Sequence, residues 1–211
     1  MPTPPNARSV KIDSDERGGW SSDRPRREGG PPRPADISVR CRVLRPSDAL
    51  RYSPGSLLVI ASASPAERDR FAERMIENKA ALLSLDKVRG LLAGRVPDDE
   101  IDARGAELLD AAVRKRLEAG DTVVITTGLD PEERERYVRM AAPLRRPRHL
   151  ILFEGKGDEL SDEDKATLSA LRRRVMAGEV GDEGFQTAMR LSGQSIADVR
   201  RIVFRPPPQD D

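Results

Sequence analysis

The chain has 211 residues, of which 37% are apolar and 35% are charged, and its 37 basic and 36 acidic residues leave a net charge of +1. This length suffices for one domain with a sizeable core, and the balanced charge gives no support to nucleic-acid binding driven by bulk charge, although a local basic face stays open. Its one cysteine and one histidine exclude an internal disulfide and metal centres rich in Cys or His. The sequence shows no apolar run long enough to span a membrane and no signal-peptide core, so we expect a cytoplasmic protein with no membrane partner.

The first 35 residues are rich in Pro, Gly, Arg, Ser and Asp. They carry too little apolar surface to offset the entropy of ordering, so residues 1–35 are expected to be a disordered tail. Trp20 is the one large apolar residue in this tail, and a protein partner could dock there. Residues 36–211 are expected to form a single domain.

Within that domain, apolar runs and helix-start signals alternate along the chain. Ile37, Val39, Cys41 and Val43 alternate with other residues as in a half-buried strand, in which Cys41 is a small core residue. Further strands are expected at 57–61, 81–84, 122–126, 149–153 and 184–191. Helices are expected at 65–77, 86–92, 97–120, from Pro131 onward, 161–178 and 196–202. The apolar face of helix 97–120 is expected to hold Ile101, Leu108, Leu109, Ala112, Val113 and Leu117. This alternation predicts a three-layer α/β fold, a parallel sheet with helices on both faces.

The turn after strand 57–61 is the most informative segment. A buried strand that runs into a helix near Pro65 is where P-loop nucleotide-binding proteins carry G-x-x-x-x-G-K-[ST]. Here Ser62 and Glu67 stand at the two glycines, Arg68 at the lysine and Asp69 at the Mg²⁺-binding hydroxyl. Glycines allow backbone N–H groups to wrap around a phosphate, and Glu67 would instead place a negative charge beside it.

Four segments between Ser56 and Leu191 resemble the P-loop kinases of the polynucleotide kinase and zeta-toxin type. The first is the strand, turn and helix just described. The second is residues 84–92, similar to the family's D-x-x-R segment through Asp86 and Arg89. The third is residues 120–129, similar to its G-x-x-V-V-V-D-A-T-N-L strand. The fourth is helix 161–178 with Gly184-Phe185, similar to its lid helix and the segment that follows.

The resemblance implies a P-loop NTPase-like fold and assigns roles to residues. Asp86 would be the general base and Arg89 would hold substrate phosphate, while Arg172, Arg173 and Arg174 would clamp phosphates as lid residues. The nucleotide-binding positions are Ser62, Ser64, Arg68, Asp69 and Thr126. The family's distal aspartate falls on Thr126, so the glycines, the lysine, the hydroxyl and this acid are all changed together. Phosphoryl transfer depends on positioning and charge neutralisation, so these changes favour its loss.

Each candidate also has a purely structural interpretation. Arg68 could pair with acids on a solvated helix start, and Asp69 could stabilise the helix dipole. Asp86 could cap a helix with Arg89 on its surface. Arg172–Arg174 could form the solvated side of an amphipathic helix. His149, at the start of an apolar strand, is expected to be structural.

Three hypotheses for function follow. The first is a non-catalytic binding or regulatory module for a phosphorylated ligand, either a nucleotide or a nucleic-acid end, without cofactor or metal. The second is an active ATP- and Mg²⁺-dependent kinase with an atypical phosphate loop, acting on a polynucleotide or a small-molecule hydroxyl. The third is a scaffold that binds a protein partner through residues 1–35.

Overall fold

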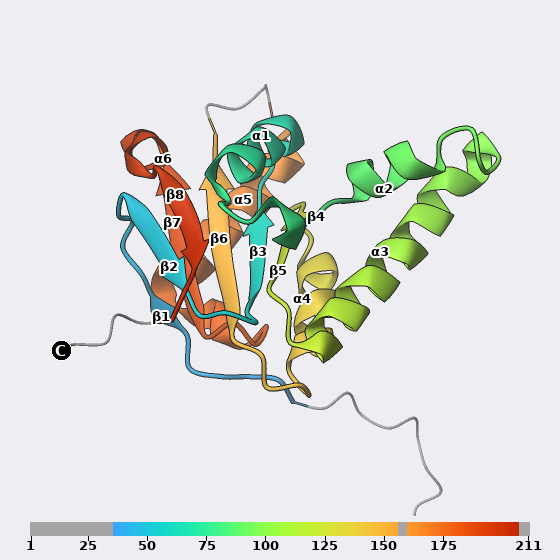
Figure 1. The fold of residues 1–211 in the computed structure, drawn as a ribbon. Helices are drawn as coiled ribbons and strands as arrows, with labels where there is room; N and C mark the ends of the chain where they lie inside the picture. Colours follow the sequence, from blue (N-terminus) through green and yellow to red (C-terminus); the bar gives the residue numbers. More distant parts are fainter. Residues whose placement is uncertain (1–35, 156–159, 207–211) are drawn as a thin grey trace, which may run out of the picture. The chain divides into compact units, whose positions relative to one another are not determined.

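The computed structural model describes residues 36–155 and 160–206 of the chain (Figure 1). Its centre is a sheet of six strands, in the spatial order β1-β7-β6-β3-β5-β4, and every neighbouring pair is parallel. The strands are β1 (Arg42–Val43), β3 (Leu57–Ala61), β4 (Leu82–Leu83), β5 (Val123–Thr127), β6 (Arg148–Glu154) and β7 (Thr187–Ser192). The predicted parallel α/β sheet is therefore confirmed. The disordered tail and Trp20 predicted for residues 1–35 lie outside the described residues.

Six helices, three short 3₁₀ turns and a second pair of strands complete the described part of the domain. The helices are α1 (Pro65–Met75), α2 (Leu85–Leu92), α3 (Ile101–Ala119), α4 (Pro131–Ala141), α5 (Asp162–Ala177) and α6 (Gln194–Asp198). The 3₁₀ turns are Lys79–Ala81, Asp98–Glu100 and Glu179–Gly181. The second pair consists of two parallel strands, β2 (Ala49–Tyr52) and β8 (Arg201–Phe204). No described helix is long and apolar enough to cross a membrane.

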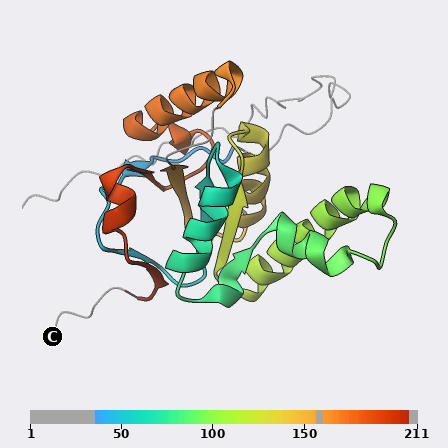
Figure 2. The same cartoon turned by 90° about the horizontal axis from the view of Figure 1, so that it is seen from above.

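Strand β3 is buried on both faces, as its uninterrupted run of apolar residues predicts. On one face, Leu57 and Val59 pack in a core with residues of α3, α4 and α5. On the other, Leu58 and Ile60 pack with α1 and the β2/β8 pair. Figure 2 shows α1 on one side of the sheet and α4 and α5 on the other. The fold therefore has three layers, as expected.

The order of the strands marks one edge of this sheet as the place for a ligand. From β3 the chain crosses through α1 to β4, two positions away, returns to β5, and then passes over β3 to β6 and β7. The connections thus leave β3 and β6 in opposite directions. In open parallel sheets, ligands bind at the carboxyl ends of the strands where the direction of winding reverses. These ends are Ala61 in β3 and Glu154 in β6.

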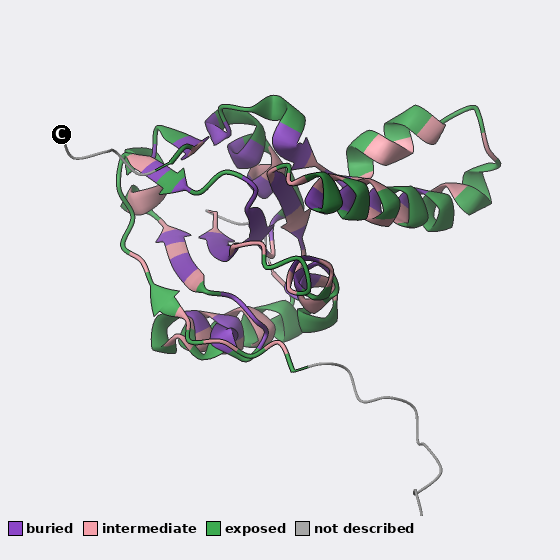
Figure 3. Cartoon of the chain, turned by 60° about the horizontal axis from the view of Figure 1, so that its bottom comes forward, coloured by how far each residue is buried: buried purple, intermediate pink, exposed green. Residues whose placement is uncertain are grey.

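Helices α2 and α3 pack against each other and project from the sheet as an arm (Figure 1). Gly105 makes the contact close, because a Cβ at this position would lie 3.2 Å from Leu85 Cδ1. Figure 3 shows that much of the arm is exposed or half-buried. Leu108, expected on the apolar face of the long helix, is 49% exposed, so this expectation is wrong. The buried face consists of Gly105, Leu109, Val113 and Leu117.

Two further sequence expectations are corrected near the ends of the described domain. The helix expected to continue to residue 202 ends at Asp198, and the chain then forms strand β8. The partner of β8, strand β2, was not predicted, because its segment has only two apolar positions that face the core, Leu50 and Tyr52. The alternating segment from Ile37 forms a strand only at Arg42–Val43, although Val39 N–H also bonds to Gly181 O.

His149 is buried within a small polar network beneath β2. Its ring centroid lies 4.6 Å from that of Tyr52, its Nδ1 lies 2.8 Å from Thr187 Oγ1, and its Nε2 lies 3.3 Å from Ser56 Oγ. Ser56 Oγ donates its only hydrogen to Ser53 O, so Nε2 must donate to Ser56 and Nδ1 must accept from Thr187. The neutral imidazole therefore satisfies both neighbours. Burial, aided by the charge of Arg148, lowers the pKa of His149 to about 4.

This burial predicts a specific loss of stability in mild acid. In the unfolded chain the pKa of a histidine is about 6.5, so the unfolded state binds the extra proton first. The contribution of neutral His149 is complete above pH 6.5 and decreases by about 3 kcal/mol as the pH falls to about 4. Urea unfolding of wild type and His149→Gln across this range measures it. The variant should show a flatter pH dependence, and identical slopes would contradict the assignment.

Candidate functional site

The turn between β3 and α1 is three residues long, from Ser62 to Ser64. Ser62 N–H donates to Thr127 O at 3.2 Å, and Ser62 Oγ accepts from Ser64 N–H at 3.0 Å. Both serines are buried, at 2% and 6% exposure. Ser62 and Ser64 therefore lie together at the predicted position, and their hydrogen bonds join the turn to itself and to the end of β5.

This turn lacks the geometry of a phosphate cradle. Helix α1 begins at Pro65, the fourth of the eight motif positions, so Glu67 already lies in its first turn. A backbone nest needs residues of left-handed conformation next to right-handed ones. Among the described residues, the one non-glycine residue with a positive φ is Arg145, far from this turn. The backbone N–H groups therefore do not converge on a common point.

Arg68 points inward from α1 to the end of β5. Its Nη1 donates to Thr127 O at 2.5 Å, its Nε donates to Asp69 Oδ1 at 2.7 Å, and the residue is 7% exposed. The pairing with Asp69 agrees with the structural interpretation, but the expected solvated surface does not, because the guanidinium is buried. Thr126 is half-exposed beside Ile60 of β3. Arg68 therefore contacts the carbonyl of Thr127, the last residue of β5, through its Nη1 hydrogen bond.

Glu67 occupies space between α1 and the end of β6. A Cβ at Gly155 would overlap the Glu67 carboxylate, so the carboxylate lies directly against the Gly155 backbone. An acid in this place adds negative charge where a nucleotide phosphate would need neutralisation. The carboxylate of Asp69 is already engaged in an internal ion pair with Arg68.

The end of β6 holds a carboxylate clamped by two arginines. Glu154 accepts two hydrogen bonds from Arg172 of α5, at 2.9 and 2.8 Å, and two from Arg190 of β7, at 2.8 and 3.0 Å. Burial alone would raise the pKa of Glu154, but the hydrogen bonds from Arg190 and Arg172 outweigh it and hold the pKa below its usual value. Glu154 and Arg190 were not singled out from the sequence, because no local pattern relates β6 to β7.

The three candidate lid arginines do not converge. Arg172 is held by Glu154, and Arg173 is exposed. Arg174 bonds to Glu183, which accepts from Arg134 of α4 at 3.0 and 3.1 Å. Consecutive residues of a helix point in directions about 100° apart, so a run of three cannot face one ligand.

Asp86 and Arg89 lie on one face of α2, as their spacing predicts. Arg89 Nη1 donates to Asp86 Oδ1 at 3.0 Å, and Arg89 Nε donates to Asp102 Oδ1 of α3 at 2.8 Å. All three side chains are exposed, and together they carry a net charge of −1. The structure therefore brings this predicted pair together, but on the α2/α3 arm and with a second acid beside it.

A groove of about 510 Å³ lies at the carboxyl edge of the sheet, between α1 and α6. Its apolar lining includes Phe71 and Phe153, whose ring centroids are 4.8 Å apart. Arg70 and Arg74, four residues apart on α1, are exposed and line it from one side. Its size lies within the range of small-molecule sites. A larger hollow of about 810 Å³, near Gly55 and Thr122, lies at the opposite edge, where strands begin.

The described residues contain no group of three or more His, Cys, Asp or Glu side chains placed to hold a metal ion. ATP with Mg²⁺ is what a P-loop fold would bind. Three features do not fit a Mg²⁺-bound nucleotide: the short turn, the acid Glu67 in the first turn of α1, and the ion pair that Asp69 forms with Arg68.

Residues 69–166 match a protein-family model described as an AAA domain, which covers just under half of the chain. The match begins directly after Arg68. No curated protein matches the chain. Among solved structures, a protein from Chloroflexus aurantiacus, described only provisionally as a kinase, is similar at 13% identity and a TM-score of 0.41, over 65% of this chain and 85% of that one. A sugar kinase from Janibacter is similar at 16% identity and a TM-score of 0.35, over 68% and 91%.

The strand order and the family match together give the fold as P-loop NTPase-like. The match includes the segments of Asp86 and Thr126 and excludes most of the phosphate-loop positions.

The buried ion pair between Arg134 of α4 and Glu183, in the segment before β7, predicts a large stability effect. Arg134→Ala would leave Glu183, whose side chain is 2% exposed, with only Arg174 to neutralise it, and should lower the free energy of unfolding by about 3–5 kcal/mol. Arg104→Ala on α3 removes exposed pairs with Glu100 and Glu107 and should cost about 0.5 kcal/mol. Urea denaturation compares them, and equal losses would contradict the importance of the buried pair.

Proposed function

We propose that this protein is a P-loop kinase-like module that does not transfer phosphoryl groups and that binds a phosphorylated ligand, a nucleotide or a nucleic-acid end. The observation that carries the first half is Arg68. In a working phosphate loop the corresponding cation faces the nucleotide phosphates. Here the guanidinium is turned toward the Thr127 carbonyl and Asp69, and it is buried.

The surroundings of Arg68 support the same proposal. Glu154 neutralises Arg172, so the lid arginine nearest to the sheet edge already has an anion in place. Removing a single preorganised donor can lower a catalytic rate by about 10²–10³. Here Arg68, Arg172 and Arg174 are all engaged in internal ion pairs.

For the ligand, the groove between α1 and α6 is better suited than the Asp86–Arg89 pair. A dianionic phosphate would be repelled by the net negative charge of Asp86, Arg89 and Asp102. The charged lining of the groove is instead two arginines, Arg70 and Arg74, and one acid, Glu67, beside apolar residues. This combination suits a flat apolar group that carries a phosphate, since arginine binds phosphate with two parallel N–H bonds.

The second candidate is an active kinase, favoured by Asp86. This carboxylate is exposed in the first turn of α2, where it could accept a proton from a hydroxyl substrate. A scaffold acting through residues 1–35 is a third candidate, and its binding arm lies outside the described residues.

Calorimetry with Mg·ATP separates the first two candidates. We expect no binding of ATP that depends on Mg²⁺ or on Arg68, because the turn has no nest and Asp69 is already paired with Arg68. Micromolar binding that requires Mg²⁺ and that Arg68→Ala abolishes would establish a functional phosphate loop. That result would replace the non-catalytic module with the kinase.

Binding of a 5′-phosphorylated oligonucleotide and of AMP tests the groove. Both should bind more tightly than the unphosphorylated oligonucleotide and adenosine. Arg74→Ala should weaken the phosphorylated ligands by about 1.5–3 kcal/mol, the scale of a charged hydrogen bond. Arg114→Ala, on the exposed face of α3, is the control and should have no effect. Equal affinity for each phosphorylated ligand and its unphosphorylated counterpart would rule out the site.

A further inference from the structure

Positive charge is concentrated in two short segments that are far apart in the sequence. Residues 40–51 and 200–205 together contain seven arginines and one acid, Asp48, a net charge of +6. Since the whole chain carries +1, the remaining residues carry −5. All seven arginines are exposed. The near-neutral total therefore conceals a strong separation of charge.

The fold brings these two segments together in the β2/β8 pair. Leu50 and Tyr52 of β2 lie opposite Ile202 and Phe204 of β8 and face the core. Because side chains alternate along a strand, Arg51 and Arg201 point to the opposite, outer face. Arg205 continues this face, since its N–H bonds to Tyr52 O and extends the ladder by one step.

Val203 lies at the centre of this outer face. It is opposite Arg51 in the register and two residues from both Arg201 and Arg205 on its own strand. Although it points away from the core, Val203 is only 3% exposed. Long arginine stems can pack on apolar surface while their guanidinium groups stay in water. Arg51, Arg201 and Arg205 are the register neighbours of Val203 on this face.

The positive charge of this face is largely uncompensated. Arg205 pairs with Glu77 at 2.8 Å. No carboxylate in the described part of the chain forms an ion pair with Arg45, Arg51 or Arg201. Arg45 and Arg51 also line one shallow hollow of about 260 Å³, so the basic surface extends past the end of β2. We call Arg45, Arg51, Arg201 and Arg205 the β2/β8 arginine face.

We propose that the β2/β8 arginine face binds the phosphodiester backbone of a nucleic acid without reading its sequence. Arginine forks match phosphate oxygens, and a regular row of phosphates can engage several of them at once. Base reading by stacking would need an exposed aromatic ring, but Tyr52 is buried and Phe204 faces the core. A membrane surface fits less well, because the one large exposed apolar residue on this part of the sheet is Val43, at 37%.

This surface is separate from the ligand groove of the proposed function. The arginine face belongs to β2 and β8, whereas the groove is lined by α1, α6 and the end of β6. The face would hold any stretch of a nucleic acid, whether or not it carries a terminal phosphate. Each proposal can therefore fail without the other.

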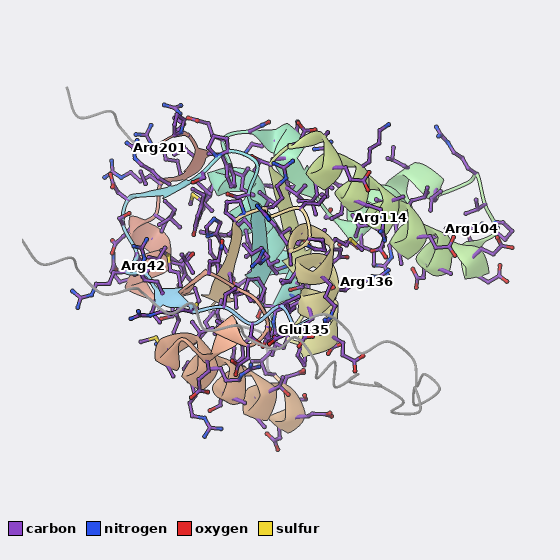
Figure 4. The ribbon with its side chains drawn as sticks, turned by 90° about the horizontal axis from the view of Figure 1, so that it is seen from below. Arg42, Arg104, Arg114, Glu135, Arg136 and Arg201 are labelled. Carbon is purple, nitrogen blue, oxygen red and sulfur yellow. The ribbon has the colours of Figure 1, made fainter. Side chains whose placement is uncertain are left out.

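Fluorescence anisotropy with a labelled duplex and a labelled single strand, both lacking terminal phosphates, tests the proposal on the full chain. The Arg51→Glu/Arg201→Glu variant should weaken binding by about tenfold or more at low salt. It should also reduce the slope of log K against log salt by about 2, one for each lost phosphate contact. The control, Arg95→Glu/Arg114→Glu, changes the net charge equally on the α2/α3 arm. Figure 4 shows Arg201 and Arg42 on the opposite side of the domain from Arg114.

The control should retain the wild-type affinity within about threefold, since distant exposed charges are screened. Equal loss in both double variants would overturn the proposal, because it would show a bulk effect of charge. It would also be overturned if wild type binds neither strand form at low salt, or if it binds anionic vesicles or polyglutamate as tightly as nucleic acid. Thermal unfolding of both variants establishes that they are folded. If the Arg51→Glu/Arg201→Glu protein is folded and has lost binding, the nucleic-acid binding of the wild type is assigned to the β2/β8 arginine face.

Discussion

A guanidinium group removed from water needs oxygen acceptors for its N–H groups, and this requirement organises the domain. Arg134 is fully buried and is satisfied by Glu183 and by Leu129 O, which links α4 to the segment before β7. Arg148, at the start of β6, donates to Gly184 O in the same segment, and burial lowers the pKa of its guanidinium. Arg68 follows the same rule at the other end of the sheet. In each case a strand end or a turn lies where a cation requires oxygen atoms.

The same requirement explains how the cations at the carboxyl edge are neutralised by the protein's own carboxylates. In a nucleotide complex the ligand supplies the anion that neutralises the cations at the carboxyl edge. Here Asp69 and Glu154 supply carboxylates to Arg68, Arg172 and Arg190. The edge is therefore electrostatically satisfied by the protein itself. A free phosphate loop would retain unpaired positive charge, and the internal pairs remove that charge without a ligand.

The sequence predicts those parts of the fold that depend on local pattern. The apolar run at Leu57–Ala61 and the helix-start proline at Pro65 specify a buried strand followed by a helix, and both are found. Strand β8 was missed because its alternation is short and its partner is about 150 residues away, so no local signal exists. The bonds of Arg172 to Glu154 and of Arg68 to Thr127 O were missed for a related reason. Residue type shows that an arginine can bind an anion, but only the fold shows that Glu154 or Thr127 O already occupies it.

Net charge is similarly a poor guide to where a protein can bind polyanions. A total of +1 removes long-range attraction by the whole molecule, but screening confines each interaction to about 8 Å at physiological salt. The register of β2 and β8 places Arg51 on the same face as Arg201 and Arg205. The parallel register of β2 and β8 converts two weakly basic segments into one basic surface. The charge that a partner experiences is thus set by strand pairing, which composition does not contain.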